Sequence, residues 1–130
     1  MSHLSERDVL AKTIYAEARG EPDEGQRAVA HVIKNRAAKN RDYWGGSSVK
    51  GVCLKDKQFE CWNGRSDIDI NEPHAYQKAQ RIADEVLSSR DPRNDPSRGS
   101  THYNNPDKED PDWGRKIPKT TKIGKHQFYE

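Results

Sequence analysis

The chain has 130 residues, of which 31% are hydrophobic and 34% are charged, so it can form one small core under a very polar surface. Its 23 basic and 21 acidic residues give a net charge of +2 and are spread along the chain. This argues against a nucleic-acid-binding protein, which needs clustered Lys and Arg, and we expect a single domain over residues 1–130.

The beginning of the sequence predicts a helix instead of an apolar leader. Met1-Ser2-His3-Leu4 leads directly into a helix that Ser5 and Asp8 would cap, because this pair approximates a capping box. No apolar run has the length of a signal-peptide core or of a membrane span. We therefore expect no signal peptide in this chain and no membrane insertion, and we expect a monomer.

Glu17 is a charged residue on the inward-facing stripe of this first helix, predicted over residues 4–17. Leu10, Ile14 and Glu17 stand at i, i+4 and i+7, so a carboxylate occupies a position where the helical period calls for an apolar side chain. A desolvated carboxylic acid keeps its proton to higher pH, as general acid catalysis requires. The alternative is a Glu that turns outward or caps the following helix.

A helix break follows Glu17 directly. Gly20 and Pro22 disfavour continuation, and Pro22 suits the first turn of a second helix, predicted over residues 23–36. The inner face of that helix would consist of Ala28, Val29, Val32, Ile33 and Arg36. Glu17 is therefore expected at a corner between two helices, where a cleft can open.

The middle of the chain gives weaker signals. Residues 40–48 are rich in turn formers and indicate a loop, and residues 49–54 fit irregular structure with a short strand better than a helical turn. Cys53 and Cys61 are compatible with a disulfide and equally with two free thiols. Their spacing, without nearby His or Cys partners, does not indicate a zinc site.

The second half of the chain predicts one more helix and a small sheet. Pro73 begins a helix with apolar residues at helical spacing, which the Ser88–Pro92 stretch ends. Residues 91–118 are rich in Pro, Asp, Asn, Ser and Gly, and we expect an ordered binding loop with short strands near 101–103 and 126–129. The predicted fold is α+β and mainly helical, with a small sheet or hairpin.

Five ordered sequence blocks resemble the SleB/CwlJ family of cell-wall hydrolases, which are spore-cortex-lytic enzymes with relatives among bacteriophage lysins. The blocks are Ala16–Pro22 with Glu24–Gln26 and Asn35-Arg36, Val49–Val52, Gln58–Asn63, Thr101–Pro106 with Trp113, and Ile123–Tyr129. The resemblance runs from near residue 8 to the C-terminus. It implies a lysozyme-like or lytic-transglycosylase-like fold and, as partner, the glycan strands of peptidoglycan.

The resemblance also implies cleavage of the MurNAc-β-1,4-GlcNAc bond by a lytic transglycosylase without a cofactor. In that reaction one Glu acts first as acid and then as base, while the muramic acid C6 hydroxyl attacks C1 and leaves a 1,6-anhydro product. Such an enzyme acts on the bacterial cell wall, and a bare domain fits a lysin that is made in the cytoplasm and then released. The absence of an N-terminal wall-binding repeat puts a germination role in doubt.

Three alternatives differ from this activity. A hydrolytic muramidase needs a second carboxylate, for which Glu21 and Glu24 are candidates, and the helix dipole would keep Glu24 ionised in the first turn of the second helix. A dipole-compensating role for Glu24 is at least as consistent with its position. The other two are a non-catalytic peptidoglycan-binding module and a zinc amidase using His102 and His126, although no tight ligand pair supports the zinc site.

Sugar rings bind to aromatic faces, and their hydroxyls bind to amide and guanidinium groups. The residues expected to bind substrate are Tyr15, Arg19, Trp62, Asn63, His102, Tyr103 and Asn104. Arg19 has a structural alternative, an ion pair with Glu21 or Glu24. Phe59 and Phe128 are expected in the core, and Trp113 fits either role.

Overall fold

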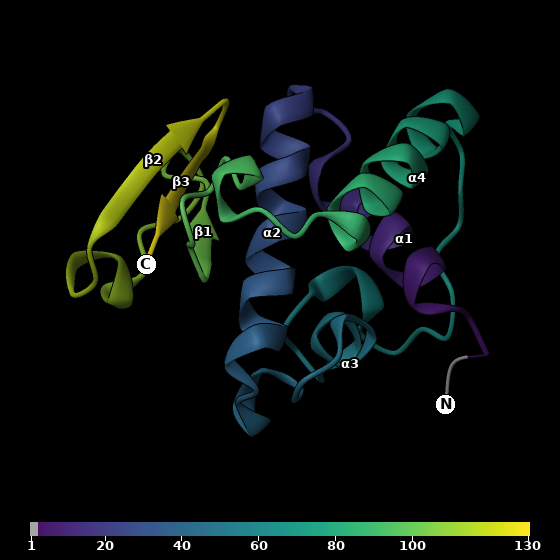
Figure 1. The fold of residues 1–130 in the computed structure, drawn as a ribbon, viewed down its shortest axis with the longest axis horizontal. Coiled ribbons are helices and arrows are strands. Elements are labelled where there is room, and N and C mark those ends of the chain that lie inside the picture. Colours follow the sequence, from purple (N-terminus) through teal and green to yellow (C-terminus); the bar gives the residue numbers. More distant parts are fainter. Residues whose placement is uncertain (1–2) are drawn as a thin grey trace.

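The computed structural model describes residues 3–130 and has the predicted mainly helical α+β architecture. Within these residues the helices are α1 (Glu6–Ala18), α2 (Asp23–Lys39), α3 (Val49–Leu54) and α4 (Pro73–Ser88), and the strands are β1 (His102–Asn104), β2 (Lys119–Ile123) and β3 (His126–Tyr129). Short 3-10 helices are η1 (Asp42–Trp44), η2 (Glu60–Trp62), η3 (Pro92–Asn94) and η4 (Asp112–Arg115). In Figure 1, α2 stands between the sheet on one side and α1 and α4 on the other.

The start of α1 follows the predicted capping chemistry. Ser5 is the N-cap, and its hydroxyl accepts a hydrogen bond from the amide of Asp8 at 3.1 Å. The helix buries Leu10 and Ile14 completely and ends at Ala18, one residue after Glu17. The local signals therefore defined both ends of this helix to within two residues.

The turn between α1 and α2 differs from the prediction in one detail. Pro22 is the N-cap of α2 with an extended backbone, so it precedes the first turn instead of lying in it. The helix then runs to Lys39, three residues beyond the predicted end, where Asn40 adopts a left-handed conformation (φ 51°) and donates its amide to the carbonyls of Arg36 and Ala37.

The prediction of a short strand at residues 49–54 was wrong, because this segment is the helix α3. Ser48 caps it, accepting from the amide of Gly51 at 2.9 Å. Its buried residues Val49, Val52 and Cys53 have the i, i+3, i+4 spacing of a helix face, which packs against α1 and α2. Cys53 is buried, Cys61 is partly buried, and both are free thiols.

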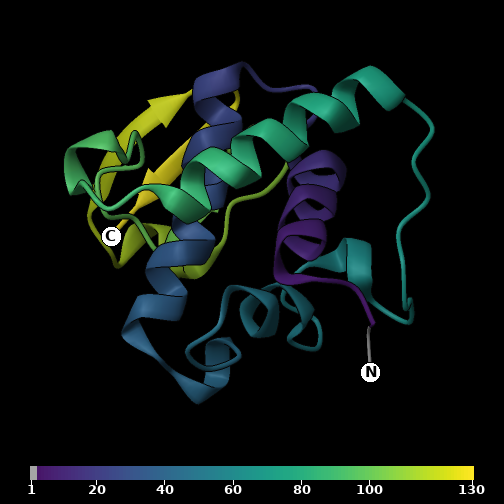
Figure 2. The same ribbon diagram turned by 45° about the vertical axis from the view of Figure 1, so that its right-hand side comes forward.

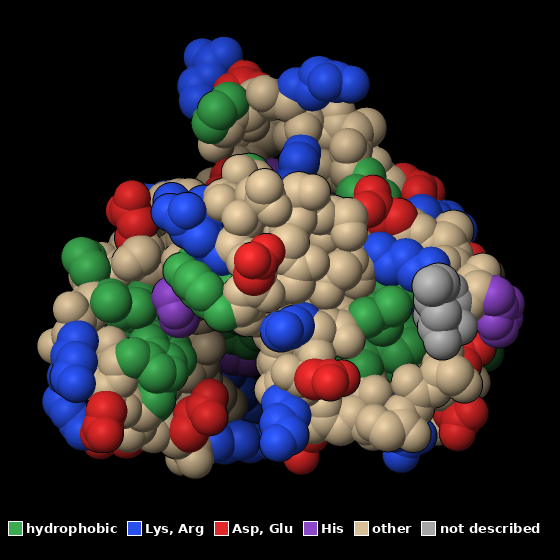
Figure 3. Space-filling model, turned by 90° about the horizontal axis from the view of Figure 1, so that it is seen from below, with side chains coloured by type: hydrophobic (Ala, Val, Ile, Leu, Met, Phe, Trp, Pro, Cys, Tyr) green, Lys and Arg blue, Asp and Glu red, His purple; other side chains and the backbone are tan. Residues whose placement is uncertain are grey.

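Helix α4 begins at Pro73, as predicted, and packs against both α1 and α2 (Figure 2). Its buried residues are Ala79, Ile82, Ala83 and Val86, which lie on one face. No helix within residues 3–130 is long and apolar enough to span a membrane. On the face shown in Figure 3, basic and acidic side chains are interspersed, in agreement with their even distribution along the sequence.

The sheet is antiparallel with the strand order β1-β3-β2. Strands β1 and β3 lie close to the two predicted short strands, whereas β2 was not predicted because Lys119–Ile123 has only one aliphatic residue. Tyr103 pairs with Phe128, which is fully buried. The β2–β3 turn passes through Gly124, whose positive φ of 56° favours glycine.

Trp62 is a core residue, which corrects its assignment as a substrate-binding residue. Its side chain is buried, and its indole N–H donates to the hydroxyl of Thr13 on α1 at 2.8 Å. A ring held in this way has no face available to a sugar. Phe59 and Phe128 are buried in the core as predicted.

The Trp62–Thr13 hydrogen bond predicts a measurable stability effect. Thr13→Val should lower the free energy of unfolding by about 1–3 kcal/mol, because it leaves a buried indole N–H without an acceptor. In a Trp62→Phe background this N–H is absent, so the same substitution should cost less. Urea denaturation of the two single variants and the double variant measures the difference, and an equal cost in both backgrounds would contradict this role for Thr13.

Candidate active site

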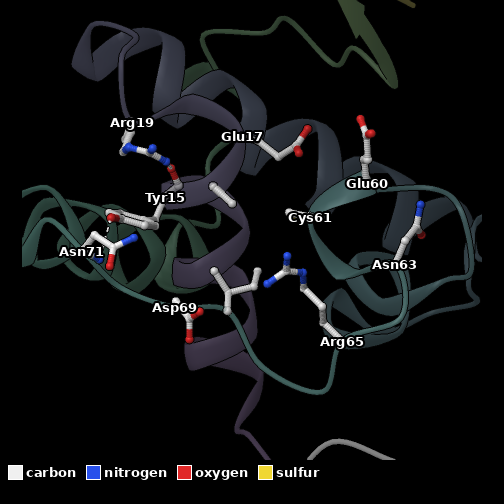
Figure 4. Close-up of a pocket in the computed structure, with 11 residues that line it drawn as sticks. Tyr15, Glu17, Arg19, Glu60, Cys61, Asn63, Arg65, Asp69 and Asn71 are labelled. Carbon is white, nitrogen blue, oxygen red and sulfur yellow. Dashed lines mark hydrogen bonds between the residues drawn. The ribbon is translucent and has the colours of Figure 1, made fainter.

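A cleft of about 770 Å³ opens where α1 ends (Figure 4). Its lining comes from the last turn of α1, from η2 and from the segment that leads to α4. The lining residues are Tyr15, Ala16, Glu17, Arg19, Glu60, Cys61, Asn63, Arg65, Ile68, Asp69 and Asn71. The cleft thus lies beside Glu17 at the end of α1, but it opens toward η2 and the segment before α4, and none of its lining residues belongs to α2.

Glu17 lies at the edge of this cleft in the desolvated setting that the helical period predicts. Burial raises the pKa of its carboxyl, while hydrogen bonds from the Tyr103 hydroxyl and the Cys61 thiol lower it in part. The negative charges of Glu60 and Glu109 raise it further, so the net pKa is above the ordinary value. Glu17 therefore keeps its proton to higher pH than an exposed Glu, while remaining open to the cleft.

The position of Glu17 follows from the local sequence. The residue comes three positions after the buried Ile14, so it starts on the inner face of α1. The helix ends at Ala18, and the turn through Gly20 to Pro22 directs the chain into α2, so no further turn of α1 covers the carboxylate. A half-buried acid at an open helix end is the result.

Tyr103 is the long-range partner of Glu17. Its hydroxyl donates to Glu17 Oε1 at 3.1 Å across 86 positions of sequence. Burial, with the charge of Glu17 adding to it, raises the pKa of Tyr103 well above its ordinary value, so the phenol stays protonated and remains a donor. The sheet thus brings to α1 the one predicted substrate-binding residue that contacts Glu17 itself.

Three other predicted residues do line the cleft. Tyr15 is only 2% exposed, which corrects its assignment as a substrate-binding residue: its hydroxyl accepts from the backbone amides of Asn71 and Glu72, both at 3.0 Å, and so supports the cleft wall. Arg19 lies over the Tyr15 ring, 4.8 Å from its centroid, and pairs with Glu72 at 2.6 Å instead of with Glu21 or Glu24. Asn63 accepts the amide of Lys57 at 3.1 Å and keeps its amide nitrogen available.

Glu24 is not at this cleft, which corrects its expected role beside Glu17. Its side chain is 63% exposed, contacts Arg27 at 3.4 Å, and lines a separate hollow near the β2–β3 turn. The turn before α2 moves the first residues of that helix away from the end of α1. The dipole-compensating reading of Glu24 fits this position.

Asn104 and His102 also lie outside the cleft, because adjacent residues of a strand point to opposite faces. Asn104 is buried and accepts the Tyr129 hydroxyl at 2.7 Å. His102 packs between the rings of Trp44 and Trp113, with centroids 5.7 and 5.0 Å away. Of the three consecutive predicted residues in β1, only Tyr103 faces Glu17.

Four charged or thiol-bearing residues of the cleft were not predicted from the sequence: Glu60, Cys61, Arg65 and Asp69. Figure 4 shows Glu60 and Cys61 beside Glu17, and the Arg65 guanidinium below Cys61, pointing toward the middle of the lining residues. Glu60 and Cys61 belong to the block that contains Trp62 and Asn63, so that block held the signal. The other two lie in a polar stretch without periodicity, which gives no such signal.

The described chain offers no evident metal centre. Within residues 3–130, no group of three or more His, Cys, Asp and Glu side chains is arranged to hold a metal ion. The cleft combines the desolvated acid Glu17 with the exposed carboxylates of Glu60 and Asp69, with neutral hydrogen-bond donors and with two guanidinium groups. This combination suits proton transfer to and from a bound polar substrate.

Comparison with known proteins gives a consistent result. A family model described as Cell Wall Hydrolase matches residues 20–129. The spore cortex-lytic enzyme of Bacillus subtilis strain 168 is 34% identical over 122 residues, which cover 94% of this chain and 36% of that protein. The spore cortex-lytic enzyme of Halalkalibacterium halodurans is 33% identical, over 95% of this chain and 35% of that protein. This chain therefore spans about a third of the length of these relatives.

Two solved structures resemble the whole fold. The catalytic domain of the germination-specific lytic transglycosylase SleB from Bacillus anthracis matches with a TM-score of 0.76 and 29% identity, covering 100% of this chain and 99% of that one. The catalytic domain of the Bacillus cereus SleB protein matches with a TM-score of 0.71 and 30% identity, covering 100% and 94%. The lysozyme-like α+β fold expected from the sequence is confirmed.

The raised pKa of Glu17 predicts a pH-dependent cost to stability. The folded state binds this proton more tightly than the unfolded state, so stability falls as pH rises from the ordinary carboxyl pKa through the folded one. Glu17→Gln should therefore unfold at higher urea concentration than the wild type at neutral pH, with no difference below about pH 4.

The exposed Glu24 supplies a matched control for this measurement. Glu24→Gln removes the same charge from a solvated position, so it should give no gain in stability at neutral pH. A Glu17→Gln variant that is no more stable than the wild type at neutral pH would show that the Glu17 carboxylate is adequately solvated.

Proposed function

The chain belongs to the cell wall hydrolase family, and on this basis we propose that it is a peptidoglycan-degrading glycosidase that cleaves the MurNAc-β-1,4-GlcNAc bond. The observation that carries the proposal is the desolvated Glu17 carboxyl at the edge of the cleft, held by Tyr103. The proposed partner is a glycan strand of the bacterial cell wall, bound by a monomer.

In the proposed first step, Glu17 acts as the general acid. The raised pKa keeps the Glu17 carboxyl protonated to higher pH. The carboxyl donates this proton to the glycosidic oxygen as the bond between that oxygen and muramic acid C1 breaks. Glu17 is then a carboxylate in a partly desolvated site. The hydroxyl of Tyr103 and the thiol of Cys61 donate hydrogen bonds to it, which stabilise this ionised state.

In the proposed second step, the same Glu17 acts as the base. It removes the proton from the C6 hydroxyl of the muramic acid residue while the C6 oxygen bonds to C1. The products are a 1,6-anhydromuramoyl end and a free GlcNAc 4-hydroxyl, and Glu17 regains its proton. One acid therefore completes the cycle. This fits the cleft, because the other two acids that line it, Glu60 and Asp69, are exposed, whereas Glu17 is partly buried.

Hydrolysis is the second candidate, and Glu60 is the residue that favours it. Glu60 lines the same cleft, and its charge raises the pKa of Glu17, so the two carboxyl groups interact. A carboxylate in this position could activate water or stabilise a cationic intermediate. Its exposed side chain lacks the fixed geometry that such a role requires, so we prefer the single-acid reaction.

The polar lining suggests how the substrate is oriented. Arg65 points into the cleft, and its side chain has no ion-pair partner within residues 3–130. Its guanidinium could bind the carboxylate of a muramic acid lactyl group or of a peptide stem. Asn63, whose side chain is exposed, would hydrogen-bond the sugar hydroxyls, while the buried Tyr15 supports the cleft wall.

Product analysis distinguishes the two reactions. Mass spectrometry of digested sacculi should show anhydromuramoyl ends, because the C6 hydroxyl is the proposed nucleophile. Parallel digestion with a hydrolytic muramidase gives the reference masses of reducing ends. Reducing muramic acid ends from this protein would establish hydrolysis, and a folded protein that releases no muropeptides would contradict both reactions.

Substitution of the cleft acids tests the role of Glu17. Glu17→Gln should reduce the clearing of peptidoglycan suspensions by about 10²–10⁴-fold, since it removes the general acid but keeps the acceptor for Tyr103. Glu60→Gln should stay active and shift the high-pH limb of the activity profile to lower pH, because the charge that raises the pKa of Glu17 is gone. Glu24→Gln should match the wild type. A loss in Glu60→Gln equal to that in Glu17→Gln would favour the two-carboxylate reaction.

A further inference from the structure

Glu21 and His126 are buried together at the β2–β3 turn, neither lines the cleft, and the proposed reaction uses neither of them. Glu21 lies in the turn between α1 and α2, and His126 is the first residue of β3. Their side chains are 10% and 11% exposed, and Glu21 Oε1 is 3.7 Å from His126 Nδ1. Two titratable groups kept from water at this place require a structural or functional reason.

The β2–β3 turn encloses the Glu21 carboxylate. Oε1 accepts the amide of Lys125 at 3.0 Å, and a Cβ at Gly124 would lie only 2.5 Å from the same oxygen. A Cβ at Gly25 would lie 3.2 Å from the Glu21 Cβ. The absence of side chains at these two glycines lets the hairpin close over Glu21, so this residue determines where the hairpin lies relative to α1.

The hairpin in turn places His126 against Tyr103. The two ring centroids are 4.9 Å apart, and Phe128 flanks Tyr103 on the same sheet face at 5.8 Å. Burial lowers the pKa of His126 despite the opposing charges of Glu21 and Glu109, so the imidazole is neutral at neutral pH. His126 Nδ1 has no hydrogen-bond partner in the described chain, so the packing of the ring is its principal contact with the site.

These contacts form one path from the helix corner to the candidate acid. Glu21 fixes the hairpin, His126 contacts the Tyr103 ring, and the Tyr103 hydroxyl reaches Glu17 at 3.1 Å. We propose that His126, anchored through Glu21, is a positioning residue that holds the Tyr103 hydroxyl on Glu17. Its link to catalysis rests on the proposed function, whereas its effect on the Glu17 carboxyl does not.

Few charged or titratable groups lie close to His126 and Glu17. His126 faces Glu21 from the corner, Glu109 from the loop before η4, and Tyr103 from β1. Glu17 faces Tyr103, Cys61, Glu60 and Glu109. Since Glu21 is not among the largest influences on the pKa of Glu17, whereas Tyr103 is, a change at the hairpin should reach Glu17 mainly through Tyr103.

The test is a ¹³C NMR titration of the Glu17 carboxyl in the full chain, with its signal assigned by its loss in Glu17→Gln. Tyr103→Phe should raise the pKa of Glu17, because it removes a hydrogen bond to the carboxylate. His126→Leu should raise it in the same direction, because an aliphatic side chain does not hold the Tyr103 ring in place. His126→Phe should leave it near the wild-type value.

A double variant distinguishes loss of the Tyr103 hydroxyl position from a general loosening of the fold. In a Tyr103→Phe background, His126→Leu should cause no further rise in the pKa of Glu17, because the hydroxyl that it positions is already absent. A rise of the same size in both backgrounds would overturn the proposal. So would an unchanged or lowered pKa in the single His126→Leu variant.

Two glycine variants test the role of Glu21 in anchoring the hairpin. Gly124→Ala drives a Cβ into the Glu21 carboxylate and should raise the pKa of Glu17 as His126→Leu does, so it carries the test if His126→Leu does not fold. Gly20→Ala is the matched control, because a Cβ there meets nothing within 4 Å at the same corner. His74→Leu, an exposed histidine on α4, should also leave Glu17 unchanged.

Measurements of kcat and KM test whether His126 and Glu21 affect the proposed reaction. His126→Leu should lower kcat by roughly three- to tenfold with little change in KM, because the lost hydrogen bond stabilises Glu17 only after its proton has left. An unchanged kcat beside a raised Glu17 pKa would separate the pair from catalysis and overturn that part of the proposal. A fully active Glu17→Gln would instead overturn the proposed function and leave the titration result standing.

Discussion

The organisation of the site depends on one constraint, the partial desolvation of a carboxyl group at the end of α1. A carboxylate there is unfavourable unless donors compensate it, and the compensation comes from the Tyr103 hydroxyl and the Cys61 thiol. Each donor belongs to a different part of the chain, one to β1 and one to η2. The sheet and the η2 segment must therefore both pack correctly before Glu17 acquires its perturbed pKa.

This dependence explains why a small hydrophobic core can support a defined site. The core consists of the facing surfaces of α1, α2, α3 and α4, together with Phe59, Trp62 and Phe128. The sheet contributes Phe128 to this core and is also held at the helix corner, where the β2–β3 turn encloses the Glu21 carboxylate. Apolar packing and the polar contacts at the corner thus act together on the position of the sheet.

Sequence periodicity predicted those parts of the molecule that depend on neighbours within one helix. The inward position of Glu17, the cap at Ser5 and the helix at Pro73 all follow from such local patterns. Trp62 and Asn104 were assigned to the groove because of their residue types, but their polar atoms are satisfied inside the fold by Thr13 and Tyr129. Burial of this kind depends on long-range packing, which residue type does not encode. The alternation of a strand could have shown that His102, Tyr103 and Asn104 do not all face one side.

The pairing of a raised pKa with two donors resolves a conflict in the proposed use of Glu17 as both acid and base. Burial alone would make Glu17 a good acid but a carboxylate too unstable to form in the bond-breaking step. Strong donors alone would keep it ionised and unable to protonate the leaving oxygen. Glu17 has both influences, with burial the larger, so its pKa is raised while its carboxylate still has two donors. A second carboxylate is then unnecessary for proton transfer, so the proposed reaction does not require the exposed Glu24.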